Sequence, residues 1–327
     1  MNTWVAPKGT RLPDFIICGA MKCGTTTVHS LLNSHPHISI PEEEVHFYDI
    51  DDQLEHGDFV FRAQSDWIFP DVDANPLAYW QWYSNFFENF PADNLIGEDS
   101  TGYLASEKAL ERISLQKKTT KIVICLRNPT DRTYSHYSHL LRSGRALFNF
   151  EDTVLYTPHY VLKRSMYLKQ IRRLLSYIPR EQVFFFILED FMADKVSVTQ
   201  SLTNFLGVSF EDLPATWLNT HSNRGSGRRF PNLQILKNKL LRQAVDNRYI
   251  NHLPISDYSR TGRSRPHIDL RTRIVNKIHN TVNPFIDTKP PKMKPETRVY
   301  LDQYFKRELS GLNELIGTGV LQKWFKE

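Results

Sequence analysis

Cysteine is scarce in this chain of 327 residues, which holds only three: Cys18, Cys23 and Cys125. Three thiols cannot build a disulfide scaffold, and their spacings fit no metal site, so we expect buried free thiols. No run approaches the ~18 consecutive apolar residues of a membrane-spanning helix, and the first residues lack the apolar core of a secretory signal. The sequence therefore predicts a cytoplasmic protein without a membrane span. A catalytic domain trimmed of a membrane anchor would look the same.

The sequence also lacks internal repeats and any linker rich in proline, glycine and serine. Its composition, 40% hydrophobic and 24% charged, is that of an ordinary globular protein. We therefore predict a single domain over residues 1–327. Loop insertions are expected at about 50–92 and 254–295, where long loops suit lids or acceptor binding.

Charge is unevenly distributed along the chain. Residues 1–120 hold 8 Lys and Arg against 18 Asp and Glu, whereas residues 121–327 hold 33 against 18. The basic part favours a polyanionic ligand or substrate, and a solvated surface with uneven charge is the alternative. Five arginines gather within fourteen residues: Arg260, Arg263, Arg265, Arg271 and Arg273.

Short apolar runs alternate with segments of helical periodicity. Strands are predicted at 14–18, 94–96, 121–126 and 183–188. Helices are predicted at 28–33, 132–142, 160–177, 194–206, 232–246 and 296–316, with Asn128 and Pro129 starting the second and Gly207 ending the fourth. This alternation predicts an α/β fold with a central parallel sheet flanked by helices.

The first strand runs into Gly19-x-x-x-x-Gly24, which precedes a helix. Glycines allow a tight turn, and free amides at a helix N-terminus bind anions, so this loop predicts a phosphate cradle; a purely structural turn is the alternative. A nucleotide-triphosphate loop would continue with Lys-Ser/Thr to hold Mg²⁺. Here Thr25-Thr26 follow the second glycine and Lys22 lies inside the loop, so the magnesium position is missing.

A second constellation follows the strand at 121–126. Arg127 stands at its carboxyl end, where ligands bind in open α/β sheets, and Ser135 comes two helical turns later. The pair is suited to grip a further phosphate. An ordinary strand-to-helix connection with Arg127 in a surface salt bridge is the alternative.

These stretches resemble a known family. Phe15-Ile-Ile-Cys-Gly-Ala-Met-Lys-Cys-Gly-Thr-Thr-Thr27 resembles the 5'-phosphosulfate loop of sulfotransferases that use 3'-phosphoadenylyl sulfate (PAPS), and Arg127-Asn-Pro…Ser135 resembles their 3'-phosphate site. Glu43-Glu-Val-His-Phe-Tyr-Asp49 and Gly227-Arg-Arg-Phe-Pro231 resemble segments of the heparan sulfate branch, as does the tail from Pro295 to Trp324. The resemblance covers nearly the whole chain. It implies a single α/β domain that needs no metal and releases adenosine 3',5'-bisphosphate.

The resemblance also implies roles for single residues. Lys22 is the expected catalytic cation on the leaving oxygen. Arg127 and Ser135 are expected on the 3'-phosphate, with Gly227 and Arg228 closing over the cofactor. The 5'-phosphate is expected on the amides of Cys23, Gly24, Thr25 and Thr26.

Glu44 aligns with the general base that takes the acceptor's proton. Its neighbours Glu42 and Glu43 are expected to raise its pKa and make it a better base. His46 either orients Glu44 or the acceptor, or is itself the base. Tyr167 is either a core residue or lies near the active site.

Two departures bear on the acceptor. Relatives carry lysine where this chain has Asp99, and often where it has Glu43, so the acceptor side is more acidic here. The expected acceptor is a carbohydrate, a glycolipid or another alcohol or amine, and no nucleic acid is expected. Two other functions stay open: a nucleotide kinase or NTPase, for which Mg²⁺ dependence is the test, and a non-catalytic polyanion binder with steep salt dependence.

Overall fold

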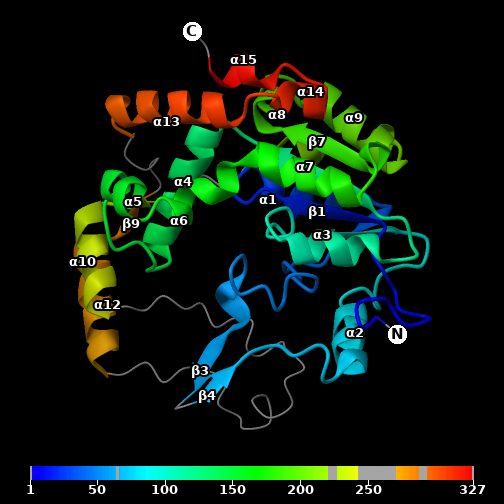
Figure 1. Cartoon of the computed structure of the whole chain (residues 1–327), viewed down its shortest axis with the longest axis horizontal. Helices are drawn as coiled ribbons and strands as arrows, with labels where there is room; N and C mark the ends of the chain where they lie inside the picture. Colours follow the sequence, from blue (N-terminus) through cyan, green and yellow to red (C-terminus); the bar gives the residue numbers. More distant parts are fainter. Residues whose placement is uncertain (1, 64–65, 220–226, 242–269, 287–292, 326–327) are drawn as a thin grey trace. The chain divides into compact units, whose positions relative to one another are not determined.

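The computed structural model describes residues 2–63, 66–219, 227–241, 270–286 and 293–325 (Figure 1). The chain divides into two compact units, and the predicted single domain stays a prediction. The first unit holds the described residues of Met1–Arg127 and Leu168–Ser222, and the second those of Asn128–Tyr167, Asn223–Asn251 and Asp257–Glu327.

The first unit is built on a five-stranded parallel sheet with the strand order β2-β5-β1-β6-β7. Every residue of the central strand β1 is buried, as expected of a strand covered on both faces. The predicted α/β fold with a central parallel sheet is confirmed. The strands are β1 (Phe15–Gly19), β2 (Ile38–Ser39), β5 (Leu95–Asp99), β6 (Lys121–Leu126) and β7 (Val183–Ile187).

Helices flank this sheet (Figure 1). Gly207 ends the helix that precedes it, with a left-handed φ of 87°, which confirms the predicted end of that helix. A small antiparallel pair, β3 (Phe61–Ala63) and β4 (Asp66–Ile68), and four short 3-10 turns complete the first unit. The helices are α1 (Thr25–Asn33), α2 (Pro76–Asn85), α3 (Glu107–Ser114), α7 (Tyr167–Tyr177, in this unit from Leu168), α8 (Leu188–Ala193) and α9 (Lys195–Leu206).

The segment 50–92 is more ordered than the predicted loop insertion. Asn75 caps α2 by accepting a hydrogen bond from the amide of Ala78, and Pro76 takes the first helical position. The helix buries Tyr79, Trp80 and Tyr83. The prediction missed α2 because this aromatic-rich stretch has no clear apolar stripe at helical spacing.

The second unit is mainly helical. The side-chain oxygen of Asn128 accepts from the amides of Thr130 and Asp131, which confirms the predicted cap. A short antiparallel pair joins β8 (Gly227–Arg228) to β9 (Phe285–Ile286). The helices are α4 (Pro129–Arg142), α5 (Phe150–Tyr156), α6 (His159–Leu162), α10 (Pro231–Leu241), α12 (Leu270–Val282), α13 (Pro295–Glu308), α14 (Leu312–Ile316) and α15 (Val320–Trp324), with a 3-10 turn at Lys163–Ser165.

Three helix predictions need correction. The helix expected at 160–177 is divided, with α6 and a 3-10 turn before α7, and the one expected at 296–316 is divided at Gly311, whose φ is 90°. Residues 270–282, read as part of a loop insertion, form α12. Residues 242–246 and the arginines at 260, 263 and 265 lie outside the described residues.

Several predicted core positions are confirmed. All three cysteines are buried and free. Tyr167 is fully buried, and its ring centroid lies 5.9 Å from that of Trp324, so it is a core residue of the second unit.

A glycine inside β5 gives a test of this packing. A Cβ built on Gly97 would lie 2.3 Å from the buried ring of Phe15, whereas one on Gly57 would meet nothing within 4 Å. Gly97→Ala should lower the free energy of unfolding by about 1–3 kcal/mol, because the core must overpack. Urea unfolding of Gly97→Ala beside the control Gly57→Ala measures this; equal stability of the two variants would contradict the packing described.

Candidate active site

The loop between β1 and α1 has the geometry of an anion cradle. Gly24 precedes α1 in the left-handed conformation, with φ 94°, and the first amides of a helix have no carbonyl partner one turn back. The amides of Thr25 and Thr26 stand at this end of α1, as predicted. The amide of Cys23 instead donates to the carbonyl of Ala20 at 3.2 Å, so it is engaged within the loop.

Backbone strain marks two predicted residues. Among the described residues that are not glycine, only Lys22 and His46 have positive φ, at 69° and 54°. Side chains with a Cβ avoid this region, and such outliers cluster at functional sites. The half-buried Lys22 and the buried His46 are therefore held in place by their surroundings.

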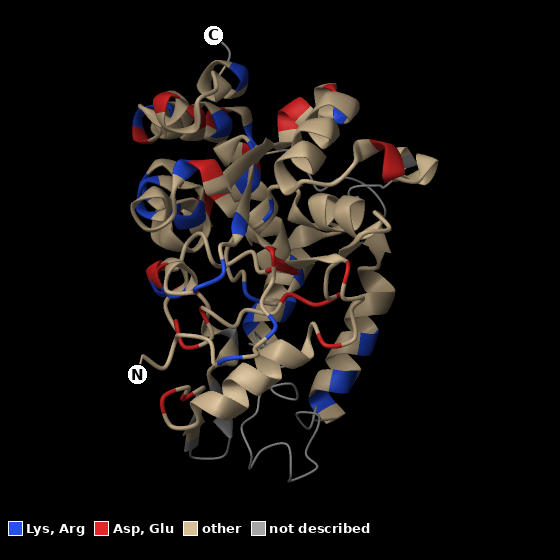
Figure 2. Cartoon of the chain, turned by 90° about the vertical axis from the view of Figure 1, so that its right-hand side faces the viewer, with Lys and Arg blue, Asp and Glu red and all other residues tan. Residues whose placement is uncertain are grey.

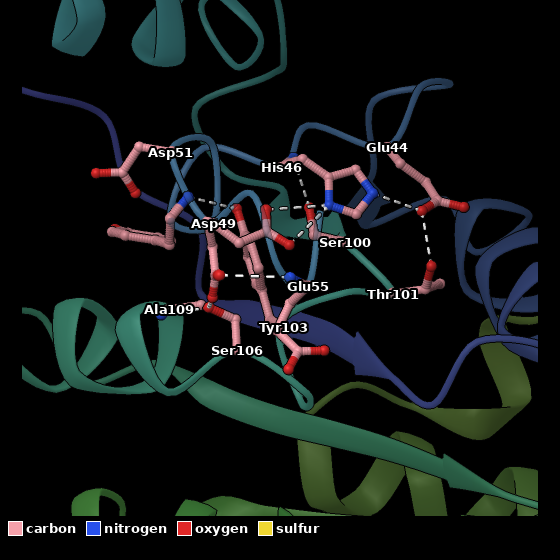
Figure 3. A network of polar contacts seen from close by, with 12 residues as sticks. Glu44, His46, Asp49, Asp51, Glu55, Ser100, Thr101, Tyr103, Ser106 and Ala109 are labelled. Atoms are coloured by element: carbon pink, nitrogen blue, oxygen red, sulfur yellow. Dashed lines mark hydrogen bonds and ion pairs between the residues drawn. The ribbon is translucent and has the colours of Figure 1, made fainter. Parts of the chain in front are cut away.

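Glu44, His46 and Asp49 form one hydrogen-bonded row. The Nε2 of His46 lies 2.8 Å from Oε2 of Glu44, and its Nδ1 lies 3.1 Å from Oδ1 of Asp49. Figure 3 shows the two carboxylates on opposite sides of the imidazole ring. Two carboxylates on the two ring nitrogens favour the imidazolium, which donates to both.

This row sets the charges of its members. Burial lowers the pKa of His46, but the charge of Asp49 and the hydrogen bonds to Asp49 and Glu44 outweigh it and raise the pKa to about 10. Burial raises the pKa of Glu44, but His46 and Thr101 lower it to about 2. The expectation that Glu42 and Glu43 raise the pKa of Glu44 is wrong, because its nearest partners are a cation and a hydroxyl donor.

A residue not singled out from the sequence joins Glu44 to the loop. The hydroxyl of Thr101 donates to Oε2 of Glu44 at 2.8 Å. A Cβ on Gly19, at the start of the loop, would lie 2.6 Å from the carbonyl oxygen of Thr101. Close approach between Thr101 and Gly19 therefore couples the candidate base to the phosphate loop. Thr101 follows the Glu98-Asp-Ser motif directly, and that adjacency is the only sequence signal for it.

The buried carboxylate of Glu98 supports the row of Glu44, His46 and Asp49 through Ser100. Glu98 accepts hydrogen bonds from Ser100 at 2.7 Å, Tyr103 at 2.6 Å and Tyr83 at 2.5 Å. Ser100 in turn accepts the amide of His46 at 2.9 Å. These contacts hold the strained backbone of His46 and fix its ring direction.

Asp99, where the resemblance to the family leads us to expect lysine, is buried at the end of β5. Its Oδ2 lies 3.3 Å from Nδ1 of His29, and its Oδ1 has no hydrogen-bond partner among the described residues. Burial raises the pKa of Asp99 to about 6, with the charge of Glu44 adding to the rise and His29 opposing it. The site thus contains a further carboxyl group besides those of Glu44 and Asp49.

One cluster in the described chain has the side chains of a metal site. His46, Asp49 and His56 place their ligand atoms within 4.8 Å of one another. However, the rings of His46 and His56 stack at 4.0 Å with an interplanar angle of 11°. In-plane lone pairs of parallel stacked rings do not converge on one ion, and both nitrogens of His46 face carboxylates. The set therefore suits hydrogen bonding better than metal binding, and metal-free chemistry stays a prediction.

The remaining predicted cofactor residues are distributed over both units. Arg127 follows β6 at the carboxyl edge of the first unit's sheet, whereas Ser135 lies on α4 and Gly227 and Arg228 form β8 in the second unit. The guanidinium of Arg228 donates to the Asn283 carbonyl at 2.8 Å and to the Asn280 side chain at 2.9 Å. Their roles as phosphate ligands stay predictions.

A parallel α/β sheet with a glycine loop after its central strand defines the class of nucleotide- and phosphate-binding folds. The match of a family model described as "Sulfotransferase domain" to residues 12–260 shows the family: the chain belongs to the sulfotransferases. The resemblance seen in the sequence is confirmed.

Two curated proteins that are similar to this chain carry the word sulfotransferase in their names. The chain is 27% identical over 183 residues to mouse heparan sulfate glucosamine 3-O-sulfotransferase 5, covering 53% of this chain and 46% of the relative. It is 28% identical over 221 residues to mouse bifunctional heparan sulfate N-deacetylase/N-sulfotransferase 4, covering 61% and 22%. The chain thus spans about half or less of the length of these relatives.

The crystal structure of a sulfotransferase from Alicyclobacillus acidocaldarius shares the fold. Its TM-score is 0.60 at 24% identity, with 96% of this chain and 99% of that chain covered. Within the part of the chain that the structure describes, no helix is long and apolar enough to cross a membrane.

The charge of His46 predicts a pH dependence of stability. Its pKa is about 10 in the folded protein against an ordinary 6.5, so the stabilisation is complete below pH ~6.5 and is lost as the pH rises towards 10. Asp49→Asn should cost about 3–5 kcal/mol near pH 7, because it leaves a buried charge without one partner. It should also flatten the loss of stability at alkaline pH.

Urea unfolding from pH 6 to pH 10 measures both effects. The exposed acid Asp73 gives the matched control Asp73→Asn, which should behave as the unmodified protein. An Asp49→Asn protein with the unmodified pH slope would show that His46 is not held as an imidazolium.

Proposed function

We propose that this protein is a PAPS-dependent sulfotransferase, moving the sulfuryl group of PAPS to a hydroxyl or amine of a carbohydrate-type acceptor without a metal. The observation that carries the proposal is the coupling of Glu44 through Thr101 to the loop of Gly19 and Lys22. It brings a proton acceptor and an anion cradle together in one unit. Family membership supports the same reaction class.

The loop acts on the leaving group. As the bond from sulfur to the phosphate oxygen breaks, the electron pair stays on that oxygen as negative charge. The ammonium of Lys22 and the amides at the start of α1 neutralise this charge, and preorganised donors of this kind lower the barrier. Lys22 keeps its orientation because the strained backbone of the loop is fixed by packing.

Glu44 acts on the acceptor. Its side chain is 40% exposed, whereas that of His46 is 2% exposed with both nitrogens engaged, so Glu44 is the group that an acceptor reaches. A carboxylate with a pKa of about 2 is a weak base towards a free alcohol. However, the acceptor oxygen becomes strongly acidic as its bond to sulfur forms, so the proton moves to Glu44 late in the reaction. His46 is a positioning residue that keeps Glu44 ionised.

The acceptor side favours neutral or cationic groups. The buried Asp99 stands beside Glu44 with one oxygen lacking a partner among the described residues. Two carboxyl groups repel a densely sulfated chain at the point of transfer and attract an amine or neutral sugar hydroxyl. A neutral glycan, an amino sugar or a glycolipid is therefore the proposed acceptor class.

The division of labour between Lys22 and Glu44 is testable. Lys22→Ala should lower turnover by about 10²–10³ and also weaken PAPS binding, because the ammonium contacts both ground state and leaving oxygen. Glu44→Gln should lower turnover by about 10²–10⁴ with unchanged affinity for adenosine 3',5'-bisphosphate. Labelled-PAPS assays with an acceptor panel and calorimetry measure both quantities.

The exposed neighbour Glu42 gives the control Glu42→Gln, which should leave both quantities unchanged. Normal turnover in Glu44→Gln together with an inactive, folded His46→Ala protein would make His46 the base. Bisphosphate binding without turnover of PAPS in the unmodified protein would leave only a binding function.

Arg127 predicts discrimination at the 3'-phosphate. Adenosine 3',5'-bisphosphate should bind about 10- to 150-fold more tightly than AMP, as one charge-assisted contact contributes about 1.5–3 kcal/mol. Arg127→Ala should remove most of this preference. Calorimetry with the two nucleotides decides the point, and equal affinities for the unmodified protein would overturn the assignment of Arg127.

A further inference from the structure

Two helices of the second unit present apolar side chains outward. On α10, Leu233, Leu236 and Leu240 recur at helical spacing, and on α12 an apolar ridge recurs at every fourth residue. These side chains are between 38% and 72% exposed: Leu233, Leu236, Leu240, Leu270, Ile274, Ile278 and Val282. We call these seven residues the apolar face.

The inward sides of the same helices are mostly polar: of the four buried side chains on them, Gln234, Asn238 and Thr272 are polar and Ile235 is aliphatic. Gln234 and Asn238 of α10 are buried, and Oε1 of Gln234 accepts a hydrogen bond from Nε2 of His279 on α12 at 2.9 Å. Asn238 donates to the carbonyls of Leu141 and Ala146 at 3.1 and 2.9 Å. These hydrogen bonds fix the orientation of α10, so the leucines cannot turn inward. This is the reverse of an ordinary surface helix, whose apolar stripe faces the core.

All charged residues on the two helices are basic. Within their bounds α10 carries Lys237 and Lys239, α12 carries Arg271, Arg273 and Lys277, and neither carries Asp or Glu. Figure 2 colours the basic residues of the described chain blue and the acidic ones red. Burial, and then the charges of Lys237 and Arg228, lower the pKa of His279. The surroundings of the apolar face therefore have a positive potential.

Two exposed aromatic residues stand close to the basic ones, Phe285 on β9 and Phe230 between β8 and α10. Phe230 and Phe285 are 44% and 53% exposed, and the guanidinium carbon of Arg228 lies 3.6 Å from the ring centroid of Phe285. Exposed leucine, isoleucine and phenylalanine among lysines and arginines are typical of helices that lie in the plane of a membrane surface.

We propose that the apolar face of α10 and α12 binds an anionic lipid surface. Acyl chains cover the leucines and isoleucines, and lipid head groups pair with the lysines and arginines. A second copy of this chain would place basic residues against basic residues, and a soluble polyanion would leave the apolar side chains in water. Of these three partners, only a lipid surface covers the apolar side chains and also pairs with the basic residues around them. The inference holds whether or not the protein transfers sulfate.

Vesicle sedimentation tests the proposal with the full chain. The protein should bind vesicles that contain phosphatidylglycerol and bind pure phosphatidylcholine vesicles much more weakly. The double variant Lys239→Gln/Lys277→Gln should bind phosphatidylglycerol vesicles about 25-fold more weakly, because each basic residue near such a surface contributes about five-fold to the affinity. The double variant Leu236→Ser/Ile278→Ser should bind the same vesicles about ten-fold more weakly, because it removes apolar area from the face.

Matched controls use exposed residues of the first unit: Lys8→Gln/Lys117→Gln for charge, and Leu54→Ser/Leu77→Ser for apolar area. Both controls should bind as the unmodified protein does. Equal binding to the two kinds of vesicle, or none, would overturn the proposal. Binding that depends on the lysines but is unchanged in Leu236→Ser/Ile278→Ser would also overturn it, because it would identify a polyanion site. A dimer of the unmodified protein that dissociates in Leu236→Ser/Ile278→Ser would overturn it as well, because a second copy would then cover the apolar face.

Discussion

The imidazolium of His46 between two carboxylates is the interaction on which the candidate site depends. A single buried cation holds Glu44 on one side and Asp49 on the other, at 2.8 and 3.1 Å. Because each carboxylate would be costly to bury beside the other without this cation, the charge of His46 permits Glu44 to stay ionised close to Asp49 and Asp99. Its strained backbone, in turn, persists only because Ser100 and the carboxylates hold it from several directions.

The same arrangement explains how a cluster of carboxyl groups and an anion cradle coexist in one unit. The loop offers Lys22 and helix amides, whereas the carboxyl groups follow from β5 and from the segment after β2. Gly19 and Gly102 permit the close approach: a Cβ on Gly102 would lie 2.5 Å from Oδ2 of Asp49, and one on Gly19 would meet Thr101. Glycine at these two places is therefore a packing requirement of the site.

The two units differ in where their apolar side chains lie. In the first, the parallel strands are buried on both faces and polar side chains gather at the carboxyl ends. In the second, α10 buries the amides of Gln234 and Asn238, while most leucines and isoleucines of α10 and α12 lie outside. Large apolar side chains on the outer side of a helix are typical of a surface that a partner covers. The apolar face of the second unit is therefore explained by the lipid surface that we propose.

The sequence by itself determined the strands at 121–126 and 183–188, the Asn128 cap and the glycine loop, because each depends on neighbours within a few residues. The resemblance marked Glu44 and His46 as candidates, but only the tertiary structure showed their hydrogen-bonded row with Asp49. Local pattern failed for α2, whose aromatic composition gives no clear apolar stripe, and for α12, whose apolar ridge lies in a segment rich in arginine and proline that was predicted as a loop insertion. The tertiary structure alone decided the charges. Thr101, 57 residues from Glu44, and the carboxylates on both sides of His46 lower the pKa of Glu44, while adjacent glutamates had predicted a rise. Electrostatic interactions depend on distance and burial in space, which spacing along the chain does not give.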